Sequence, residues 1–169
     1  MSDNDNIVNK AELTIPEFGN SKTLVLSITS IKEGERRLIE AKHTTPTSYA
    51  DLEYVFGEGY REAKKNVTAI GYEITKAEKA LREARSIAIL DHYNDFLKAK
   101  GFKDSAYIKD AFLQTREDYV AAQDRIDMLK AMLDLMEGKI KVFENVSRWM
   151  KKEIDMVMRS GMDLNKYIR

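Results

Sequence analysis

The sequence predicts an all-α protein, a fold class indicated by its composition, its scarcity of turn residues and two long heptad patterns. Of the 169 residues, 33% are charged and only 9% are aromatic. Eight Gly and two Pro leave few tight turns, which favours long helices over a sandwich of short strands. In two long segments apolar residues recur three and four positions apart, as in helices that pair along a seam. We therefore predict a helical hairpin or bundle that oligomerises.

The N-terminal region is predicted to be a flexible arm followed by a first helix. Residues 1–20 form the arm, because Asn, Asp and Ser dominate them and Pro16 and Gly19 interrupt them. The first helix is predicted over residues 21–42, and it opens a single all-helical domain that extends over residues 21–158. The β-branched residues around Val25 favour a short strand as the alternative.

A second and much longer helix is predicted over residues 48–99. Pro46 breaks the chain, and Thr47 or Ser48 can cap the helix that follows. Gly57 and Gly59 lie in its first turns, where they predict a kinked or frayed start. Its apolar seam consists of Phe56, Tyr60, Ala63, Val67, Ile70, Ile74, Ala77, Leu81, Ala84 and Ala88.

A loop and a short helix follow this long helix. Gly101 is a suitable residue to end it, because glycine readily adopts the left-handed conformation at a helix C-terminus. The short helix is predicted over residues 104–113, with Asp104 or Ser105 as its N-cap.

A third long helix is predicted over residues 115–158, with a C-terminal tail over residues 159–169. Thr115 and Asp118 have the spacing of a capping box. Both long helices also carry apolar residues beside their seams, which predicts a homo-oligomer that covers them, with a monomeric bundle as the alternative. The residues assigned to oligomerisation are Ile126, Leu129, Leu133, Met136, Ile140, Phe143 and Met150.

The sequence contains no recognisable catalytic motif. It has no Cys, which excludes disulfides and thiolate metal sites. Glu40 and His43 have the spacing of a di-metal bundle site, but the second such pair is missing. There is also no glycine-rich phosphate loop and no nucleophile motif. We predict a protein that is not an enzyme, with no catalytic residues, no metal and no cofactor.

The sequence also predicts a cytoplasmic protein without a membrane partner. The longest apolar runs, such as Leu24 to Leu26, are far too short to span a bilayer. Residues 1–10 are polar and lack the apolar region of a secretory signal.

Two groups of basic residues predict binding to single-stranded DNA through its phosphates, within a chain whose net charge is zero. The first is a row three residues apart, expected to form one slightly spiralling stripe beside the seam. It consists of Lys76, Lys79, Arg82 and Arg85. The second lies in residues 139–169, which carry eight Lys and Arg against four Asp and Glu. It consists of Arg148, Lys151, Lys152, Arg159, Lys166 and Arg169, near Trp149 and Tyr167. Trp149 is predicted either to stack on a base or to anchor an interface.

Several patches of the chain resemble the T4-type phage recombination mediators, the UvsY-like family. They are Leu90-Asp91-His92-Tyr93, the polar loop with Gly101, the run from Asp118 to Ile140, and the run from Arg148 to Ile154. The resemblance covers roughly residues 50–155. It implies a ring-like homo-oligomer that binds single-stranded DNA and helps a RecA-like recombinase to displace the single-strand-binding protein.

The resemblance gives the DNA-contacting role to Arg82 and Arg85. This basic pair lies about one helical turn further from the Leu90–Tyr93 patch than in the family, and the first 45 residues have no counterpart there. The alternative is a structural or adaptor coiled-coil protein, such as a phage assembly factor or an inhibitor of a host protein, that binds no nucleic acid.

Overall fold

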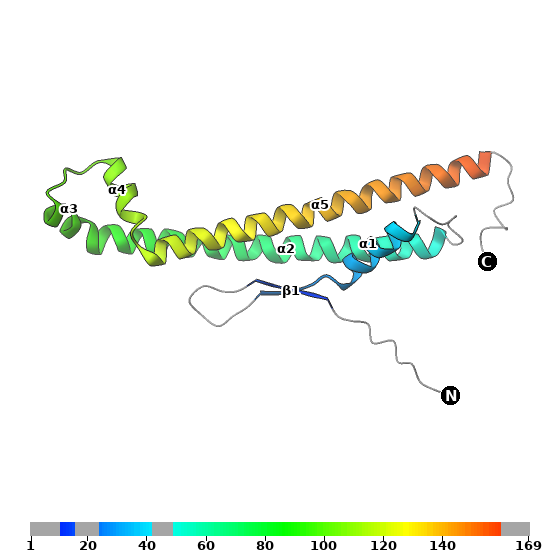
Figure 1. Cartoon of the computed structure of the whole chain (residues 1–169), viewed down its shortest axis with the longest axis horizontal. Helices are drawn as coiled ribbons and strands as arrows, with labels where there is room; N and C mark the ends of the chain where they lie inside the picture. The colour runs from blue at the N-terminus through cyan, green and yellow to red at the C-terminus, as the bar shows by residue number, and fades with distance from the viewer. Residues whose placement is uncertain (1–10, 16–23, 42–48, 160–169) are drawn as a thin grey trace, which may run out of the picture. The chain divides into compact units, whose positions relative to one another are not determined.

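The computed structural model describes residues 11–15, 24–41 and 49–159, and nearly all of them are helical (Figure 1). The predicted all-α class is confirmed. In chain order the elements are β1 (Glu12–Ile15), β2 (Leu24–Ser27), α1 (Thr29–Ala41), α2 (Tyr49–Ile87), the π-helical segment η1 (Ala88–Tyr93), α3 (Asn94–Lys100), α4 (Ala106–Leu113) and α5 (Glu117–Arg159). The helix predicted over residues 48–99 corresponds to α2, η1 and α3, and the next two correspond to α4 and α5. Their predicted ends are confirmed to within about two residues.

Where the sequence predicted one domain, packing divides the chain into two compact units. Unit 1 contains β1, β2, α1, α2 as far as Val67, and α5 from Leu135 onwards. Unit 2 contains the rest of α2, η1, α3, α4, and α5 as far as Asp134.

A short β-hairpin in unit 1 corrects the prediction for the N-terminal region. β1 pairs antiparallel with β2, with Glu12 opposite Ser27. The predicted arm is therefore wrong over Glu12–Ile15, and the first helix begins at Thr29 instead of residue 21. The alternative of a short strand is confirmed for Leu24–Ser27, where branched and apolar residues favour an extended backbone.

Two polar side chains of α2 hold the junction between β2 and α1. The Glu62 carboxylate accepts hydrogen bonds from the Ser27 hydroxyl at 2.6 Å and from the Ile31 backbone N–H at 3.0 Å. Asn66 is buried, and its Nδ2 donates to the Ser27 carbonyl at 2.7 Å. The second Glu62 bond supplies an acceptor to the first turn of α1, where backbone N–H groups lack partners within the helix.

The core of unit 1 lies where α2 and α5 run antiparallel. The rings of Phe56 and Phe143 have centroids 6.3 Å apart, and Asn66 approaches Met136 further along. Both predicted seams supply this core, because Phe56, Ala63, Met136, Ile140, Phe143 and Met150 are all buried. α2 is helical through Gly57 and Gly59, so the expected frayed start is wrong. Gly59 is buried and lies against the Phe143 ring.

Unit 2 has an aromatic cluster beside the π-helical segment. Tyr93 and Phe112 are buried, with ring centroids 5.3 Å apart, and Phe96 packs against both. The Tyr93 hydroxyl donates to the Asp104 carboxylate at 2.9 Å. Burial, followed by this carboxylate, raises the pKa of Tyr93 above its ordinary value. The cluster closes the turn between η1 and α4.

The helix ends of unit 2 follow the sequence closely, with one exception. Gly101 ends α3 with a φ of 67°, and Ser105 caps α4 by accepting from the Ile108 N–H at 3.2 Å. The predicted capping box at Thr115 is wrong. Its hydroxyl donates to the Phe112 carbonyl at 2.7 Å, and α5 begins at Glu117.

Candidate nucleic-acid interface

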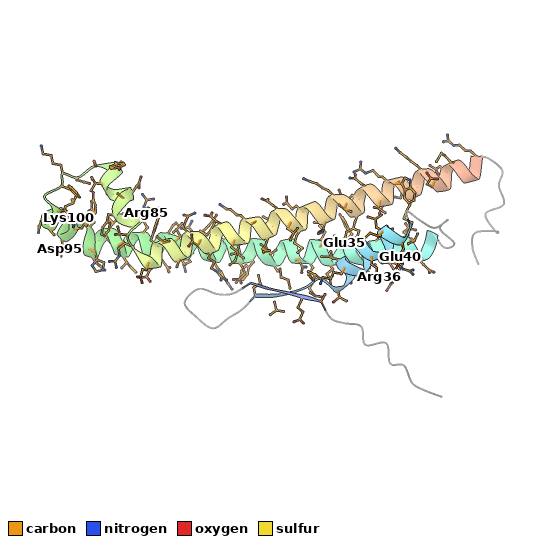
Figure 2. The ribbon with its side chains drawn as sticks, viewed as in Figure 1. Glu35, Arg36, Glu40, Arg85, Asp95 and Lys100 are labelled. Atoms are coloured by element: carbon orange, nitrogen blue, oxygen red, sulfur yellow. The ribbon has the colours of Figure 1, made fainter. Side chains whose placement is uncertain are left out.

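The four cations predicted on α2 do not form one stripe, although all four are exposed in unit 2. A helix turns by about 100° per residue, so each step of three residues moves a side chain about 60° around the axis. Over nine residues Lys76 and Arg85 come to point about 180° apart. Lys76 and Lys79 lie on one exposed side of α2, which we call the outer face. Arg82 and Arg85 lie progressively further around the helix (Figure 2 labels Arg85).

These four cations also differ in their partners. Lys76 Nζ lies 2.7 Å from Glu73, and Lys79 Nζ lies 3.8 Å from Glu83. Arg82 and Arg85 have no carboxylate within ion-pair distance among the described residues. Arg82 also lines an open depression of about 590 Å³ together with Ser86 and Ile87. The two arginines that the resemblance selects are therefore accessible to a phosphate.

An aromatic residue that the sequence analysis missed lies on the same outer face. Tyr72 precedes Lys76 by one helical turn and is 63% exposed. Lys76 Nζ lies 4.6 Å from the centre of its ring. The signal in the sequence is a tyrosine that lies off the heptad seam, between Ile70 and Ile74, and one helical turn before Lys76.

The second predicted basic group belongs to unit 1 and lies on the outer part of α5. Arg148, Lys151 and Lys152 are exposed, and among the described residues none of them contacts a carboxylate. Arg148 donates to the Asn145 side chain at 2.9 Å. Trp149 is 42% exposed, which leaves its ring accessible for stacking or for an interface. Arg159 is also exposed, and Lys166, Tyr167 and Arg169 lie outside the described residues.

The residues predicted to drive oligomerisation are occupied within the chain. Six of the seven are buried: Ile126, Leu129, Met136, Ile140, Phe143 and Met150. Leu133 is half-buried. The seam thus packs within the chain's own units, and the assignment of these residues to oligomerisation stays a prediction.

Another apolar row on α5 remains exposed in unit 1. Leu135, Val142, Trp149 and Met156 are its members. They lie seven residues apart, so they share one side of the helix along three heptads. This row, which we call the outer row, is available to a partner helix.

Two arginines of α1 are engaged in ion pairs on the surface of unit 1. Arg36 contacts both Glu33 and Glu40, and Arg37 lies 3.6 Å from Glu33. Figure 2 labels Arg36 and Glu40. The hydrogen bond from Arg36 lowers the pKa of Glu33. These arginines are therefore less accessible to phosphates than those of α2.

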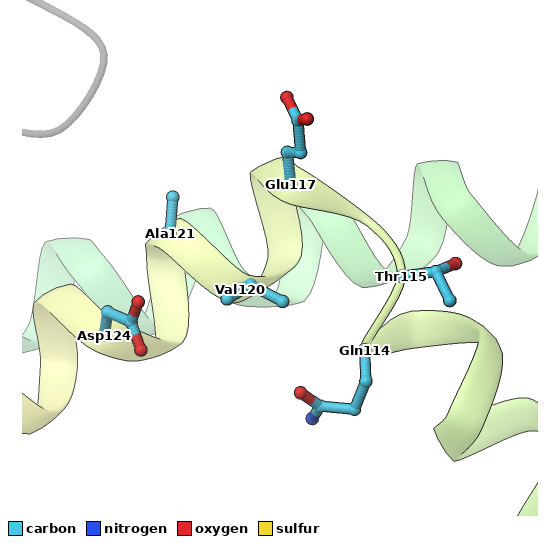
Figure 3. Close-up of a pocket in the computed structure, with 6 residues that line it drawn as sticks. All are labelled: Gln114, Thr115, Glu117, Val120, Ala121 and Asp124. Atoms are coloured by element: carbon cyan, nitrogen blue, oxygen red, sulfur yellow. The ribbon is translucent and has the colours of Figure 1, made fainter.

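A depression of about 330 Å³ in unit 2 lies at the start of α5, where the Glu117 and Gln114 side chains point in opposite directions (Figure 3). Within the described ranges no three His, Cys, Asp or Glu residues are placed to hold a metal ion, and His43 lies outside those ranges. No helix of the described parts is both long and apolar enough to cross a membrane.

Comparison with known proteins leaves the resemblance to the UvsY-like family a prediction. The chain matches no protein-family model, no curated protein and no solved structure.

Proposed function

We propose that this protein is a non-enzymatic, single-stranded DNA-binding recombination mediator, encoded by a phage, that helps to load a RecA-like recombinase. One observation carries the proposal. Five of the cations predicted to contact DNA are exposed and have no carboxylate partner among the described residues. They are Arg82, Arg85, Arg148, Lys151 and Lys152. Such cations can replace the counterions of a phosphate backbone, a contribution that does not depend on base sequence.

The layout resemblance supports the same function and adds the partners. In the UvsY-like family the protein contacts a RecA-like recombinase and the single-strand-binding protein, and we extend both partners to this chain. A mediator benefits from weak, sequence-indifferent contacts, because it must occupy any stretch of DNA and then yield it to the recombinase. A chain with zero net charge and a few accessible cations fits this requirement.

Self-association supports the proposal because it adds up weak contacts. A single chain offers only a few phosphate contacts, and linking several copies raises the effective affinity without any new contact. The outer row on α5 is the apolar surface that we assign to this association. Its spacing of seven residues suits a helix from a second copy.

A DNA titration at several salt concentrations tests the proposal. The wild type should bind a labelled oligo(dT), with log K falling against log salt by about 0.7 per phosphate contact. Arg82→Ala with Arg85→Ala should weaken binding and flatten this slope by about one to two contacts per engaged chain. The matched control is Arg36→Ala with Arg37→Ala, which removes the same charge from cations already held by Glu33 and Glu40.

Two contrary outcomes are informative. Tight binding that ignores the Arg82 and Arg85 changes would keep the function but move the site to the Arg148 group on α5. No binding by the wild type even at low salt would reject the mediator. The structural or adaptor coiled-coil protein would then be the better description, and the exposed outer row favours it, because such a row can receive a partner helix.

A further inference from the structure

Tyr72 has the exposure of a ligand-binding aromatic residue. It lies on the outer face of α2 in unit 2, and 63% of it is exposed, although its side chain is large and mostly apolar. Lys76 lies over one face of the ring at 4.6 Å, the arrangement of a cation–π contact. The contact helps to fix the orientation of the ring. With one face held by Lys76, a planar group would stack on the other face.

Two lysines lie on the side of α2 that carries the ring, each with a carboxylate partner, Glu73 at 2.7 Å from Lys76 and Glu83 at 3.8 Å from Lys79. Lys79 follows Tyr72 by seven residues, so the two side chains lie within about 20° of each other around the helix. Lys76 contacts Glu73 at 2.7 Å, but Glu73 also contacts Arg125 of α5 at 3.5 Å. One carboxylate is thus shared between two cations, with one oxygen facing Lys76 and the other facing Arg125.

Arg125 is itself unusual, because it is only 9% exposed. A buried arginine is expensive unless its charge is balanced and its donors are bonded. One Glu73 oxygen lies 3.5 Å from Arg125, while the other stays bonded to Lys76 on the outer face. Glu73 is correspondingly half-buried, whereas Lys76 and Lys79 are exposed.

We propose that Tyr72, Lys76 and Lys79 form a nucleotide site for single-stranded nucleic acid. A base stacks on the open face of the Tyr72 ring, while the two ammonium groups contact the flanking phosphates. Stacking of this kind tolerates every base, because each base has a π-face. This inference rests on the proposed function. It adds Tyr72, which contacts a base, to cations that contact only the phosphates.

Alanine and phenylalanine substitutions separate stacking from charge. Tyr72→Ala should weaken oligo(dT) binding about 5- to 100-fold, while Tyr72→Phe, which keeps the ring, should bind nearly as the wild type. The salt dependence should be unchanged in both variants, because no phosphate contact is lost. Lys79→Ala should instead flatten it by about one contact. Tyr54→Ala is the matched control, since Tyr54 is 66% exposed on the same helix but belongs to unit 1.

An abasic oligonucleotide sharpens the test. Without bases there is nothing to stack, so the wild type and Tyr72→Ala should bind the abasic strand equally. RNA and DNA oligomers of the same length should show the same loss with Tyr72→Ala, because the ring contacts the base and not the sugar. Helicity measured by circular dichroism should be identical in all variants.

The outcomes distinguish this inference from the proposed function. If the wild type binds oligo(dT) and Tyr72→Ala binds equally well, the inference is wrong and the proposed function stands. A wild type that binds no strand overturns both. A Tyr72→Ala variant that loses DNA binding together with its oligomeric state in sedimentation would assign Tyr72 to a protein interface, which also overturns the inference.

Discussion

The ring of Phe143 occupies the space that a side chain on Gly59 would need. A Cβ on Gly59 would lie 2.7 Å from Phe143 Cζ and 3.0 Å from Cε2. Gly34 of α1 approaches the same ring from another element, again with 2.7 Å to the nearest ring carbon. Phe143 is only 1% exposed, so the ring has little room to move. Two glycines therefore let three helices meet around one phenylalanine.

Gly59→Ala should destabilise the protein even though alanine is the better helix former. Overpacking of this kind costs about 1–3 kcal/mol, which outweighs the gain of about 1 kcal/mol in helix propensity. Gly57→Ala is the control, because its Cβ would meet only the end of the Arg61 side chain at 3.8 Å. Denaturant unfolding should show a loss for Gly59→Ala and a gain for Gly57→Ala. Equal gains for both would contradict the packing described.

Glu62→Ala should loosen the junction between β2 and α1. It removes the acceptor for the Ile31 N–H and for the Ser27 hydroxyl, and a lost acceptor of this kind costs about 1–3 kcal/mol. Glu58→Ala, four residues earlier, removes only a surface ion pair with Arg61 and should cost less than about 1 kcal/mol. Denaturant unfolding gives both values. Similar costs for the two changes would show that the Glu62 carboxylate does not stabilise the first turn of α1.

Tyr93 should make unit 2 sensitive to alkaline pH. Its pKa is raised in the fold, so the folded state keeps the phenolic proton after the unfolded state has lost it. Stability should therefore be complete below about pH 10 and fall as the pH rises through the folded pKa. Tyr93→Phe should flatten this fall in unfolding experiments above about pH 10. Tyr107→Phe, an exposed tyrosine of the same unit, should leave it unchanged.

Val142→Asp should disrupt assembly without unfolding the chain. Val142 belongs to the exposed outer row, whereas Ile140 is buried, so Ile140→Asp should unfold unit 1 by placing a charge in its core. Asn145→Asp adds the same charge on an exposed part of α5 and serves as the control. Sedimentation should report several chains for the wild type and for Asn145→Asp. A monomeric wild type at micromolar concentration would remove the basis for self-association.

Local signals in the sequence predict most of the helical architecture. Gly101 ends α3 and Ser105 caps α4, because backbone conformation and capping bonds depend on nearby residues. The heptad seams correctly predict which sides of α2 and α5 are buried. The hairpin of β1 and β2 could not be predicted in this way, because its second strand ends at Ser27, which is bonded to Glu62 and Asn66, far along the chain.

The candidate site is predicted less well than the fold. The four cations of α2 are exposed, but they do not share one side of the helix. A spacing of three residues moves each side chain about 60° around the axis, which the predicted stripe left out. Two ion partners, Glu73 and Glu83, are visible in the sequence at helical spacing. The contact between Glu73 and Arg125 is not, because it joins two helices through tertiary packing.

The π-helical segment Ala88–Tyr93 has a consequence for the length of the helix in which it lies. In a π-helix the hydrogen bonds join residues five apart, so Ala88 and Tyr93 come to the same side and both are buried. A regular α-helix aligns residues four apart instead. The segment thus accommodates one surplus residue while the aromatic cluster keeps its orientation. Loss of one residue here would therefore turn the segment into regular α-helix without rotating everything that follows.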